Sequence, residues 1–590
     1  MENKKVSFGR VFWPSLTAGI VILVVVGGIF AILIGSLLSG KPAFQVAPKT
    51  VLHLKLEGQI GEMSESDLSP STLSIIDKVG LADLLYGFER AKEDDRIKGV
   101  FVELENAQCG FSTATEIRNA INDFEKSGKF VVAYNRGEAV SLKQYYIASA
   151  ANESYGFSGS LFEFLGLGTE LMFFKGMFDK LDLEMQVVRG SNNAFKSAVE
   201  PFFLTEMSDS SRLQIRTYLN SMWWDVRKEI GEERGITPED LDRYADSSVI
   251  RRVADAVKYE LIDEEKFRDE VLNIIAEKVK AKSPEDIKFK DFQKYAQKKF
   301  RNNQEIVWGK DANIAVIVAE GAVVTKGAGL SSEEITKLFR KARKDKNIKT
   351  IVFRINSPGG SALASDEIWR EVKLANEEKK VIVSMGDVAA SGGYYIAAPA
   401  HKIFAQNTTI TGSIGVFGVI PYTGKMLENK LGLTFDRVST NPHAVLTTNK
   451  KLSEEEYAMI QDEVDYVYDR FLSVVAEGRG MSKEEVNVIA RGRVWTGRDA
   501  KEIGLVDEIG GLREAISYAA EQAGISKPVV RYYPKVELEP WMEIIQSLEE
   551  EESASESAPL PEEMIRLYER IKSVENMTGI QMRLPYEIVW

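Results

Sequence analysis

The chain has 590 residues, which allows roughly two to four domains at 100–200 residues each. Hydrophobic residues make up 44 % and charged residues 28 %, a balance typical of a globular rather than a disordered protein. The net charge is −13 and the sequence has no basic stripe, which argues against nucleic acid as a partner.

The first predicted element is a membrane anchor. Residues 16–38 form an uncharged run of 23 residues, long enough at 1.5 Å per residue to cross a bilayer core of about 30 Å. Lys4, Lys5 and Arg10 precede this run, and the positive-inside rule keeps that short end in the cytoplasm. A cleaved signal peptide is the alternative, although its apolar core is normally only about 7–15 residues long. We therefore predict that residues 1–46 are a cytoplasmic stub and an uncleaved transmembrane helix.

An internal repeat with a period of about 250 residues organises most of the remaining chain. Four segments recur in the same order: 52–58 with 315–321, 97–104 with 348–355, 131–148 with 381–398, and 254–263 with 498–507. Each copy alternates short apolar runs, typical of buried strands, with amphipathic segments such as 332–344, whose spacing predicts a helix. Strand–helix alternation favours a parallel sheet covered by helices. We predict two α/β domains of like fold, residues 47–300 and 301–540.

Two further segments lie outside this pattern. Residues 280–310, rich in Lys and Gln, are predicted to be a helical connector between the copies. Residues 541–590 begin with an acidic Ser/Glu/Pro stretch typical of a flexible linker. A short helix over about 561–574 and an apolar tail, 584–590, follow the linker, and the tail could dock on the body or on a neighbouring subunit.

The two copies differ where parallel sheets usually bind ligands, at the carboxyl ends of strands. The second copy carries a Gly-Gly pair at 359–360 and another at 392–393, directly after Ser391, and the first copy lacks both. Such a pair alone is typical of a turn. Glycine also lets backbone N–H groups approach a ligand closely, as an oxyanion hole requires. We predict Ser391 as a nucleophile, with the N–H groups of Gly360 and Gly392 as the oxyanion hole.

A serine nucleophile needs a base, and the chain offers few. His53, His401 and His443 are far apart and share no metal-ligand spacing. His401 is expected at the start of the next strand, away from Ser391, whereas His443 stays open as a rival base. A lysine can serve once burial lowers its pKa. Lys196 lies in the apolar context NAFKSAVEPF, and the matching stretch of the second copy has no lysine, so one copy would hold the base and the other the nucleophile.

Cys109 is the one cysteine of the chain, so no intramolecular disulfide can form. We interpret it as a packed thiol rather than a nucleophile. The sequence indicates no metal and no organic cofactor.

With these residues the chain resembles the long form of the signal peptide peptidase A family, which are serine/lysine-dyad peptidases. The matching motifs are FKSAVEPF around Lys196, NSPGGSALAS, DVAASGGYYIA around Ser391, TGSIGVFG around Ser413, and VWTGRDAKEIGLVDEIGG. The resemblance implies tandem duplicated crotonase/Clp-protease-like α/β domains behind the membrane anchor. It also implies Ser391 as nucleophile, Lys196 as base, Gly360 and Gly392 as oxyanion donors, and Ser413 as the residue that orients the lysine.

The resemblance further implies a homotetramer in the bacterial cytoplasmic membrane, with the catalytic body on the periplasmic side and cleaved signal peptides as substrates. In short members of the family the lysine and serine lie in one domain, which would require Lys425, Lys450 or Lys451 here and is less favoured. Two alternatives stay open. One is an acyl-CoA enzyme on the same fold, and the other is a non-catalytic membrane scaffold or regulator.

Overall fold

The computed structural model describes residues 45–68, 75–297, 312–327, 329–534 and 579–583 of the chain. All of these except 45–47, 68 and 75 belong to one compact unit. The predicted anchor at 16–38, the predicted helix over 561–574 and the tail at 584–590 lie outside the described residues. Within the described ranges, every helix is too short or too polar to cross a membrane.

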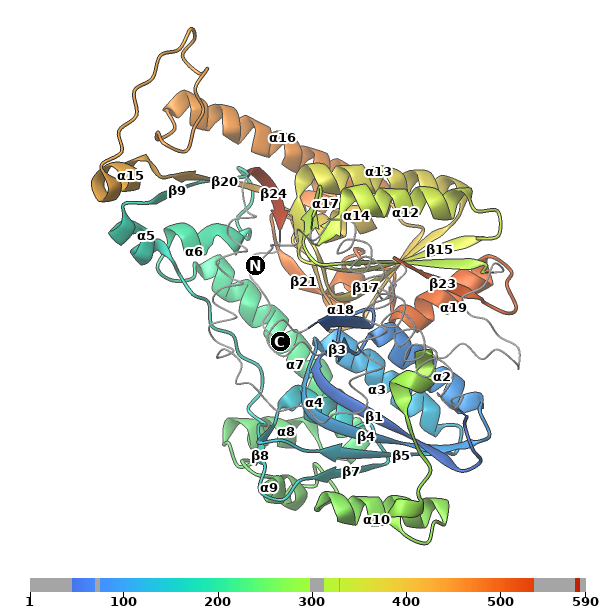
Figure 1. Cartoon of the computed structure of the whole chain (residues 1–590). Coiled ribbons are helices and arrows are strands. Elements are labelled where there is room, and N and C mark those ends of the chain that lie inside the picture. Colours follow the sequence, from blue (N-terminus) through green and yellow to red (C-terminus); the bar gives the residue numbers. More distant parts are fainter. Residues whose placement is uncertain (1–44, 69–74, 298–311, 328, 535–578, 584–590) are drawn as a thin grey trace, which may run out of the picture. The chain divides into compact units, whose positions relative to one another are not determined.

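The first repeat builds a six-stranded parallel sheet, shown in blue to green in Figure 1. Its strands, in spatial order, are β10 (Glu264–Glu265), β7 (Glu153–Gly156), β5 (Phe130–Asn135), β4 (Ile97–Gln108), β1 (Thr50–Gln59) and β11 (Phe289–Asp291). Helix α10 (Arg268–Val279) packs Val271 and Ile275 on one face, against Val51, Phe101 and Val132 of the strands. The two central strands β4 and β5 have little contact with water, which explains their apolar runs.

The other elements of the first repeat are short, apart from three longer helices. They are β2 (Glu65–Leu68), β3 (Ile75–Lys78), α2 (Leu81–Glu93), α3 (Phe111–Glu125), β6 (Ala139–Val140), α4 (Leu142–Ala148), β8 (Leu161–Phe162), α5 (Lys175–Leu181), β9 (Glu184–Arg189), η1 (Ser197–Val199), α6 (Glu200–Phe203), α7 (Asp209–Arg234), α8 (Pro238–Asp246), α9 (Val253–Lys258), η2 (Pro284–Asp286) and α11 (Phe292–Gln297). Strands β2 and β3 pair with each other, as do β6 and β8.

The prediction of a helical connector over 280–310 is wrong for its described part, 280–297. This part holds η2, strand β11 and the six-residue helix α11. The physical reason is that Ile287 and Phe289 alternate with polar residues and bury their side chains in the cluster under α10. The segment therefore extends the first sheet beside β1 instead of forming a free helix.

The second repeat builds a mixed sheet of eight strands. Its main path is β21 (Val494–Thr496), β19 (Ile410–Gly412), β17 (Val381–Ala390), β15 (Thr350–Ser357), β12 (Ile314–Glu320) and β23 (Val530–Tyr533), with β18 (Lys402–Ala405) and β22 (Glu508–Ile509) branching from β17. β21 runs antiparallel to β19, and the other pairings are parallel. The predicted helix over 332–344 is confirmed as α12 (Ser332–Lys344). The remaining helices are α13 (Ala362–Glu378), α14 (Gly392–Ala397), α15 (Gly424–Leu431), α16 (Glu454–Arg479), α17 (Lys483–Ile489), α18 (Gly497–Glu502) and α19 (Leu512–Gln522).

A third sheet joins segments from distant parts of the chain. Its order is β14 (Leu330–Ser331), β13 (Val323–Val324), β16 (Gly359–Ser361), β24 (Gly579–Arg583), β20 (Phe417–Tyr422) and β9. β9 of the first repeat runs antiparallel to β20 of the second, and β24 lies between β16 and β20. The predicted boundaries at 47, 300 and 540 stay predictions, although the two main sheets lie within residues 50–291 and 314–533 respectively.

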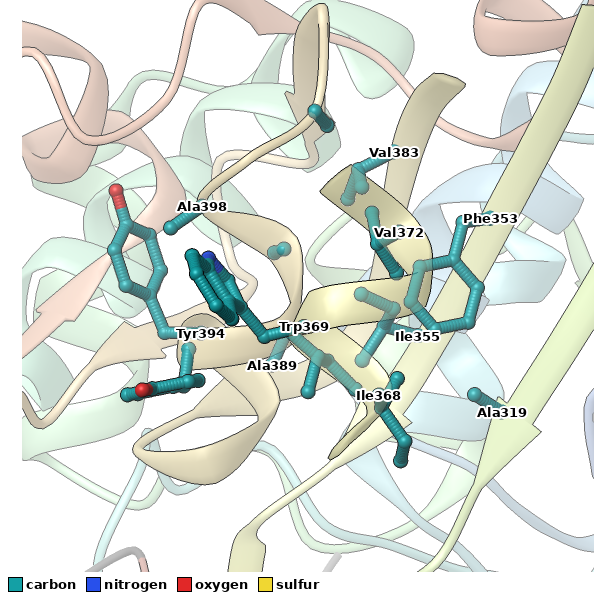
Figure 2. Close-up of a cluster of buried hydrophobic side chains, with 14 of the residues drawn as sticks. Ala319, Phe353, Ile355, Ile368, Trp369, Val372, Val383, Ala389, Tyr394 and Ala398 are labelled. Atoms are coloured by element: carbon teal, nitrogen blue, oxygen red, sulfur yellow. The ribbon is translucent and has the colours of Figure 1, made fainter. Parts of the chain in front are cut away.

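The core of the second repeat supports the strand that ends at Ser391. Figure 2 shows Ile368, Trp369 and Val372 of α13, Phe353 and Ile355 of β15, Val383 and Ala389 of β17, and Tyr394 of α14 in one cluster. The Trp369 ring lies 6.4 Å from that of Tyr395, in an edge-to-face arrangement. Each such apolar side chain stabilises the fold by about 1.5–3 kcal/mol when buried, so β17 and α14 are held on a rigid base.

Candidate active site

Ser391 occupies the junction between β17 and α14, at the carboxyl end of a central strand. Its backbone has φ +56° and ψ −115°, a conformation that side-chain-bearing residues rarely adopt. Two hydrogen bonds hold it there: its N–H donates to the Gly412 carbonyl oxygen at 2.8 Å, and its carbonyl oxygen accepts from the Tyr395 N–H at 2.8 Å. The residue is fully buried. Such a conformation persists because the surroundings fix it from both sides.

The corresponding serine of the first repeat has a different use. Ser141 precedes α4 with an ordinary φ of −71°, and its hydroxyl accepts a hydrogen bond from the Gln144 N–H at 3.2 Å. It is therefore a helix N-cap. The hydroxyl of Ser391 instead faces Lys196, and this contrast supports one catalytic centre per chain.

Lys196 reaches Ser391 from the other repeat. Its Nζ lies 2.8 Å from Ser391 Oγ, 3.0 Å from Ser413 Oγ and 3.0 Å from the Ser413 carbonyl oxygen. Lys196 and Ser413 are both fully buried, like Ser391. Ser413 follows β19, the neighbour of β17, so adjacent strand ends carry the two serines. The structure thus brings together three of the residues that the sequence singled out.

The pairing of β9 with β20 explains why these distant segments meet. β9 ends at Arg189, a few residues before Lys196, and β20 starts at Phe417, shortly after Ser413. Arg189 and Phe417 are register partners, so the lysine loop must return beside the Ser413 turn. A pairing between strands this far apart in sequence is not visible in any local pattern.

Burial lowers the pKa of the Lys196 ammonium well below its ordinary value. The reason is that a charged group loses its hydration in the interior and its neutral form does not. Its hydrogen-bond partners are hydroxyl and carbonyl oxygens, which do not offset that loss as a carboxylate would. The lysine is therefore suited to be a neutral base near neutral pH.

Gln214 of α7 fixes the backbone around the lysine, a role that sequence reasoning missed. Its Nε2 donates to the Phe195 carbonyl oxygen at 3.0 Å and to Ser197 Oγ at 2.8 Å. Its Oε1 accepts from the Val494 N–H at 3.3 Å. One buried amide thus ties both neighbours of Lys196 to the second repeat. An isolated glutamine in a helix gives no sequence signal for such a role.

Gly492 packs directly on the lysine and was also missed. It has φ +78°, and a Cβ there would lie 2.6 Å from the backbone nitrogen of Lys196. Its N–H donates to the Ile414 carbonyl oxygen at 2.7 Å, and the adjacent Arg491 carbonyl oxygen accepts from the Phe195 N–H at 2.9 Å. The turn at 491–492 therefore needs glycine in order to press the lysine loop against the Ser413 turn.

The two predicted oxyanion glycines lie on α14 and β16, two elements that contact each other. Gly392 is the first residue of α14, where helix N–H groups have no intrahelical acceptor. Gly360 lies in β16, and a Cβ there would come within 2.2 Å of the Val323 carbonyl oxygen, so only glycine fits. A Cβ on Gly393 would lie 2.7 Å from the Ser357 carbonyl oxygen, which places α14 tightly against the strand end that leads into β16. Their role as oxyanion donors remains a prediction.

The rival bases all face other partners. His401 directly precedes β18: its N–H donates to the Val381 carbonyl oxygen, and its ring stacks on Tyr518 at 6.4 Å. His443 is part-exposed and lies 3.8 Å from Glu456, which also accepts a hydrogen bond from Lys450. The other candidates form ion pairs of the same kind, Lys425 with Asp182 and Lys451 with Glu184.

Cys109 is buried, and burial raises the pKa of its thiol to about 12. The thiolate is therefore scarce at neutral pH, as expected of an inert packed cysteine. Within the described residues, no three His, Cys, Asp or Glu side chains converge in a way that could hold a metal ion.

Comparison with known proteins decides the family. The profile of peptidase family S49 matches residues 123–282 and again 373–526. The chain belongs to peptidase family S49. Among the relatives of this S49 chain, the chloroplastic serine protease SPPA of Arabidopsis thaliana is 33 % identical, over 83 % of this chain and 71 % of its own length. Protease 4 of Salmonella typhi is 34 % identical, over 77 % and 74 %. Protease 4 of Haemophilus influenzae is 33 % identical, over 82 % and 80 %.

These matches establish that the S49 chain is a serine protease, and the two S49 matches confirm the duplication. A Clp protease profile matches residues 317–411, in agreement with a Clp-protease-like α/β fold. Among solved structures, a ClpP1 mutant from Listeria monocytogenes aligns at 20 % identity over 34 % of this chain and 93 % of its own, with a TM-score of 0.24 that is too low to bear on the fold.

Proposed function

We propose that this S49 protease is a membrane-anchored endopeptidase that degrades cleaved signal peptides through a Ser391–Lys196 dyad. The observation that carries the catalytic part is the contact of 2.8 Å between a fully buried lysine amine and the hydroxyl of Ser391. The acyl-CoA and scaffold alternatives lose ground because the long matches are to proteases.

Three oxygen atoms surround Nζ, and a neutral amine, which has two N–H groups and one lone pair, can engage all three. The carbonyl oxygen and the Oγ of Ser413 each accept one N–H at 3.0 Å. The lone pair is left for the hydroxyl proton of Ser391. Ser413 therefore aims the base, in the manner of the third group of a catalytic triad.

The reaction follows from this arrangement. Lys196 Nζ takes the proton of Ser391 while Oγ bonds to the peptide carbonyl carbon, and the carbonyl electron pair moves to oxygen. The N–H groups of Gly360 and Gly392 receive that oxyanion. Collapse breaks the C–N bond, and the leaving amine takes the proton from Lys196. A water molecule, deprotonated by Lys196, then hydrolyses the acyl ester and restores Ser391.

A small apolar cluster and a surface pocket lie next to the lysine segment. Directly after Lys196, Val199 and Phe202 pack with Phe417 of β20 in a small cluster. Phe202 also lines this pocket together with Phe178 and Met185, and charged side chains line it as well: Lys175, Asp179, Asp182, Glu184 and Lys425. The peptide test below therefore decides whether an apolar peptide is preferred.

The uncharged run at 16–38 and the positive charges before it support anchorage in the bacterial cytoplasmic membrane, with the catalytic body on the periplasmic side. Such an anchor would keep the enzyme where cleaved signal peptides remain. Resistance of the intact protein to alkaline carbonate extraction, together with protease access to its body in spheroplasts, tests this placement. Release by carbonate would contradict it.

A homotetramer is the assembly we propose. Large apolar side chains are exposed on and after α15, and a second copy could cover them: Leu431, Leu433, Phe435, Val438 and Leu446. Light scattering on the detergent-solubilised protein measures the mass, and a monomer at micromolar concentration would overturn this part.

The catalytic proposal is tested by hydrolysis of a short fluorogenic peptide ester by wild type, Ser391→Ala and Lys196→Ala. Both variants should fall to background while keeping the wild-type melting temperature within a few degrees. Full activity in Lys196→Ala would move the base elsewhere, with His443 and Lys450 next to test. Degradation of a synthetic signal peptide, compared with a polar peptide of equal length, tests the substrate.

A further inference from the structure

A buried carboxylate of the second repeat lies at the start of a helix of the first repeat. Asp387 accepts three hydrogen bonds there: from the Gly110 N–H at 3.2 Å, from the Thr113 N–H at 2.9 Å and from Thr113 Oγ1 at 2.7 Å. Its side chain is 5 % exposed. These donors form the first turn of α3, where a carboxylate is favoured by free N–H groups and by the helix dipole.

The fit excludes any larger residue at the helix start. A Cβ on Gly110 would lie 2.1 Å from the Asp387 carboxyl carbon. The N-cap residue of α3 is Gly110 itself, so the capping side chain comes from a residue that is 277 positions away in the sequence. This is a cap between repeats rather than a local one.

The contact lies close to the ends of β17 and β19, the strands that precede Ser391 and Ser413. Asp387 is in β17, four residues before Ser391. β17 pairs there with β19, Val388 with Ile410 and Ala390 with Gly412, and Ser413 follows directly. A displacement of this strand pair would therefore move Ser391 and Ser413 together.

A second contact from the same helix turn reaches the two residues directly before β19. Ser112 Oγ lies 3.2 Å from Thr408 Oγ1 and 3.1 Å from Thr409 Oγ1. Thr409 Oγ1 in turn donates to the Gly386 carbonyl oxygen at 2.8 Å, beside Asp387. The first turn of α3 thus contacts β17, which precedes Ser391, and the residues directly before β19, which precedes Ser413.

We propose that Asp387 is a positioning residue, which, with Gly110 and Thr113, locks the strand carrying Ser391 to the first repeat and so sets the distance between Ser391 and Lys196. In the repeat alignment, the N-cap residue of α3, Gly110, corresponds to Ser361, the N-cap residue of α13 in the second repeat. The inference rests on the proposed dyad, because Lys196 comes from the first repeat and Ser391 from the second.

The test compares Asp387→Asn, Thr113→Val and Thr113→Ser in the full-length enzyme. In Asp387→Asn an amide N–H group faces the donors of Gly110 or Thr113. The contact between β17 and the first turn of α3 therefore weakens, while the volume of the side chain stays the same. A displacement of about 1 Å between reacting groups costs about 10²-fold in rate. We expect kcat for the peptide ester to fall 10- to 100-fold in Asp387→Asn and somewhat less in Thr113→Val, with KM within about twofold of wild type. Thr113→Ser keeps the hydroxyl and should retain most of the activity.

The matched control is Arg513→Gln, which removes an ion pair of 2.8 Å between the repeats, to Asp123, on a part-exposed surface. It should leave kcat unchanged, and an equal loss in this variant would overturn the proposal in favour of general adhesion between repeats. Wild-type kcat in folded Asp387→Asn would also overturn it.

Hydrogen exchange supplies a readout that does not depend on catalysis. Peptides covering 386–392 and 408–414 should exchange faster in Asp387→Asn than in Arg513→Gln, because the strand ends lose their hold. If wild type hydrolyses no ester, the proposed function fails, but the exchange result still tests whether Asp387 holds these strand ends to the first repeat. Equal exchange in the two variants would overturn the positioning role of Asp387 and leave the proposed function untouched.

Discussion

Ser391 carries its hydroxyl on a backbone with φ +56° and ψ −115°, which costs about 1–3 kcal/mol for a residue with a side chain. Glycine adopts this conformation freely. We therefore expect Ser391→Gly to be more stable than Ser391→Ala by about 1–3 kcal/mol in denaturant titrations, although both lack the Ser391 hydroxyl. Equal stabilities would show that the serine is not strained.

A second prediction at the scale of one residue concerns Lys196 and the dependence of the free energy of unfolding on pH. Its pKa is lowered in the folded protein, so the unfolded chain binds a proton at neutral pH that the folded chain does not. Stability must then rise with pH, from the lowered folded pKa up to the unfolded value near 10.5. Lys196→Met lacks this effect.

The melting temperature of Lys196→Met should therefore exceed that of wild type at pH 7, and the difference should shrink as the pH rises to 10. Thermal scans at four pH values in that range measure it. A difference that does not change with pH would mean that the buried amine is already charged in the folded enzyme.

At the scale of elements, the turn that follows α17 holds the lysine loop in place. Gly492→Ala adds a methyl group 2.6 Å from the backbone of Lys196, on a residue with φ +78°. Gly480→Ala, after α16, is the matched control, because it has φ +65° and, among the described residues, no atom within 4 Å of the added methyl group. Both variants pay about 1–2 kcal/mol for the left-handed backbone.

We expect kcat of Gly492→Ala to fall about 10²-fold, since the lysine must move, and that of Gly480→Ala to stay near wild type. Ester hydrolysis and melting temperatures of both variants separate the two effects. Equal activities would mean that the lysine loop shifts without misplacing the amine.

The elements also show how far sequence patterns reach. Apolar runs and helical spacing located β5, β17 and α12, because each depends on local burial. The asymmetry between the copies pointed to Lys196 and Ser391. Lys196 and Ser391 are brought together by the pairing of β9 with β20, in which Arg189 lies opposite Phe417. These strands are more than 220 residues apart in the sequence, so no local periodicity predicts that they pair. The capping of α3 by Asp387 has no local sequence signal for the same reason.

At the scale of the whole molecule, β24 (Gly579–Arg583) belongs to the third sheet, which also holds Gly360. β24 lies between β16 and β20, with Gly360 opposite Met582 and Phe417 opposite Gln581. It thus occupies the strand edge beside the predicted oxyanion glycine, where an extended peptide could pair through its backbone.

Ending the chain after residue 578 removes β24, whereas ending it after residue 583 keeps it and is the matched control. If a peptide substrate must take the same edge, kcat/KM for a peptide of eight or more residues should rise several-fold in the shorter variant and stay unchanged in the longer one. A small ester, which needs no strand pairing, should gain less. A parallel loss of both activities, with a lower melting temperature, would instead mean that β24 serves only to complete the sheet that carries Gly360.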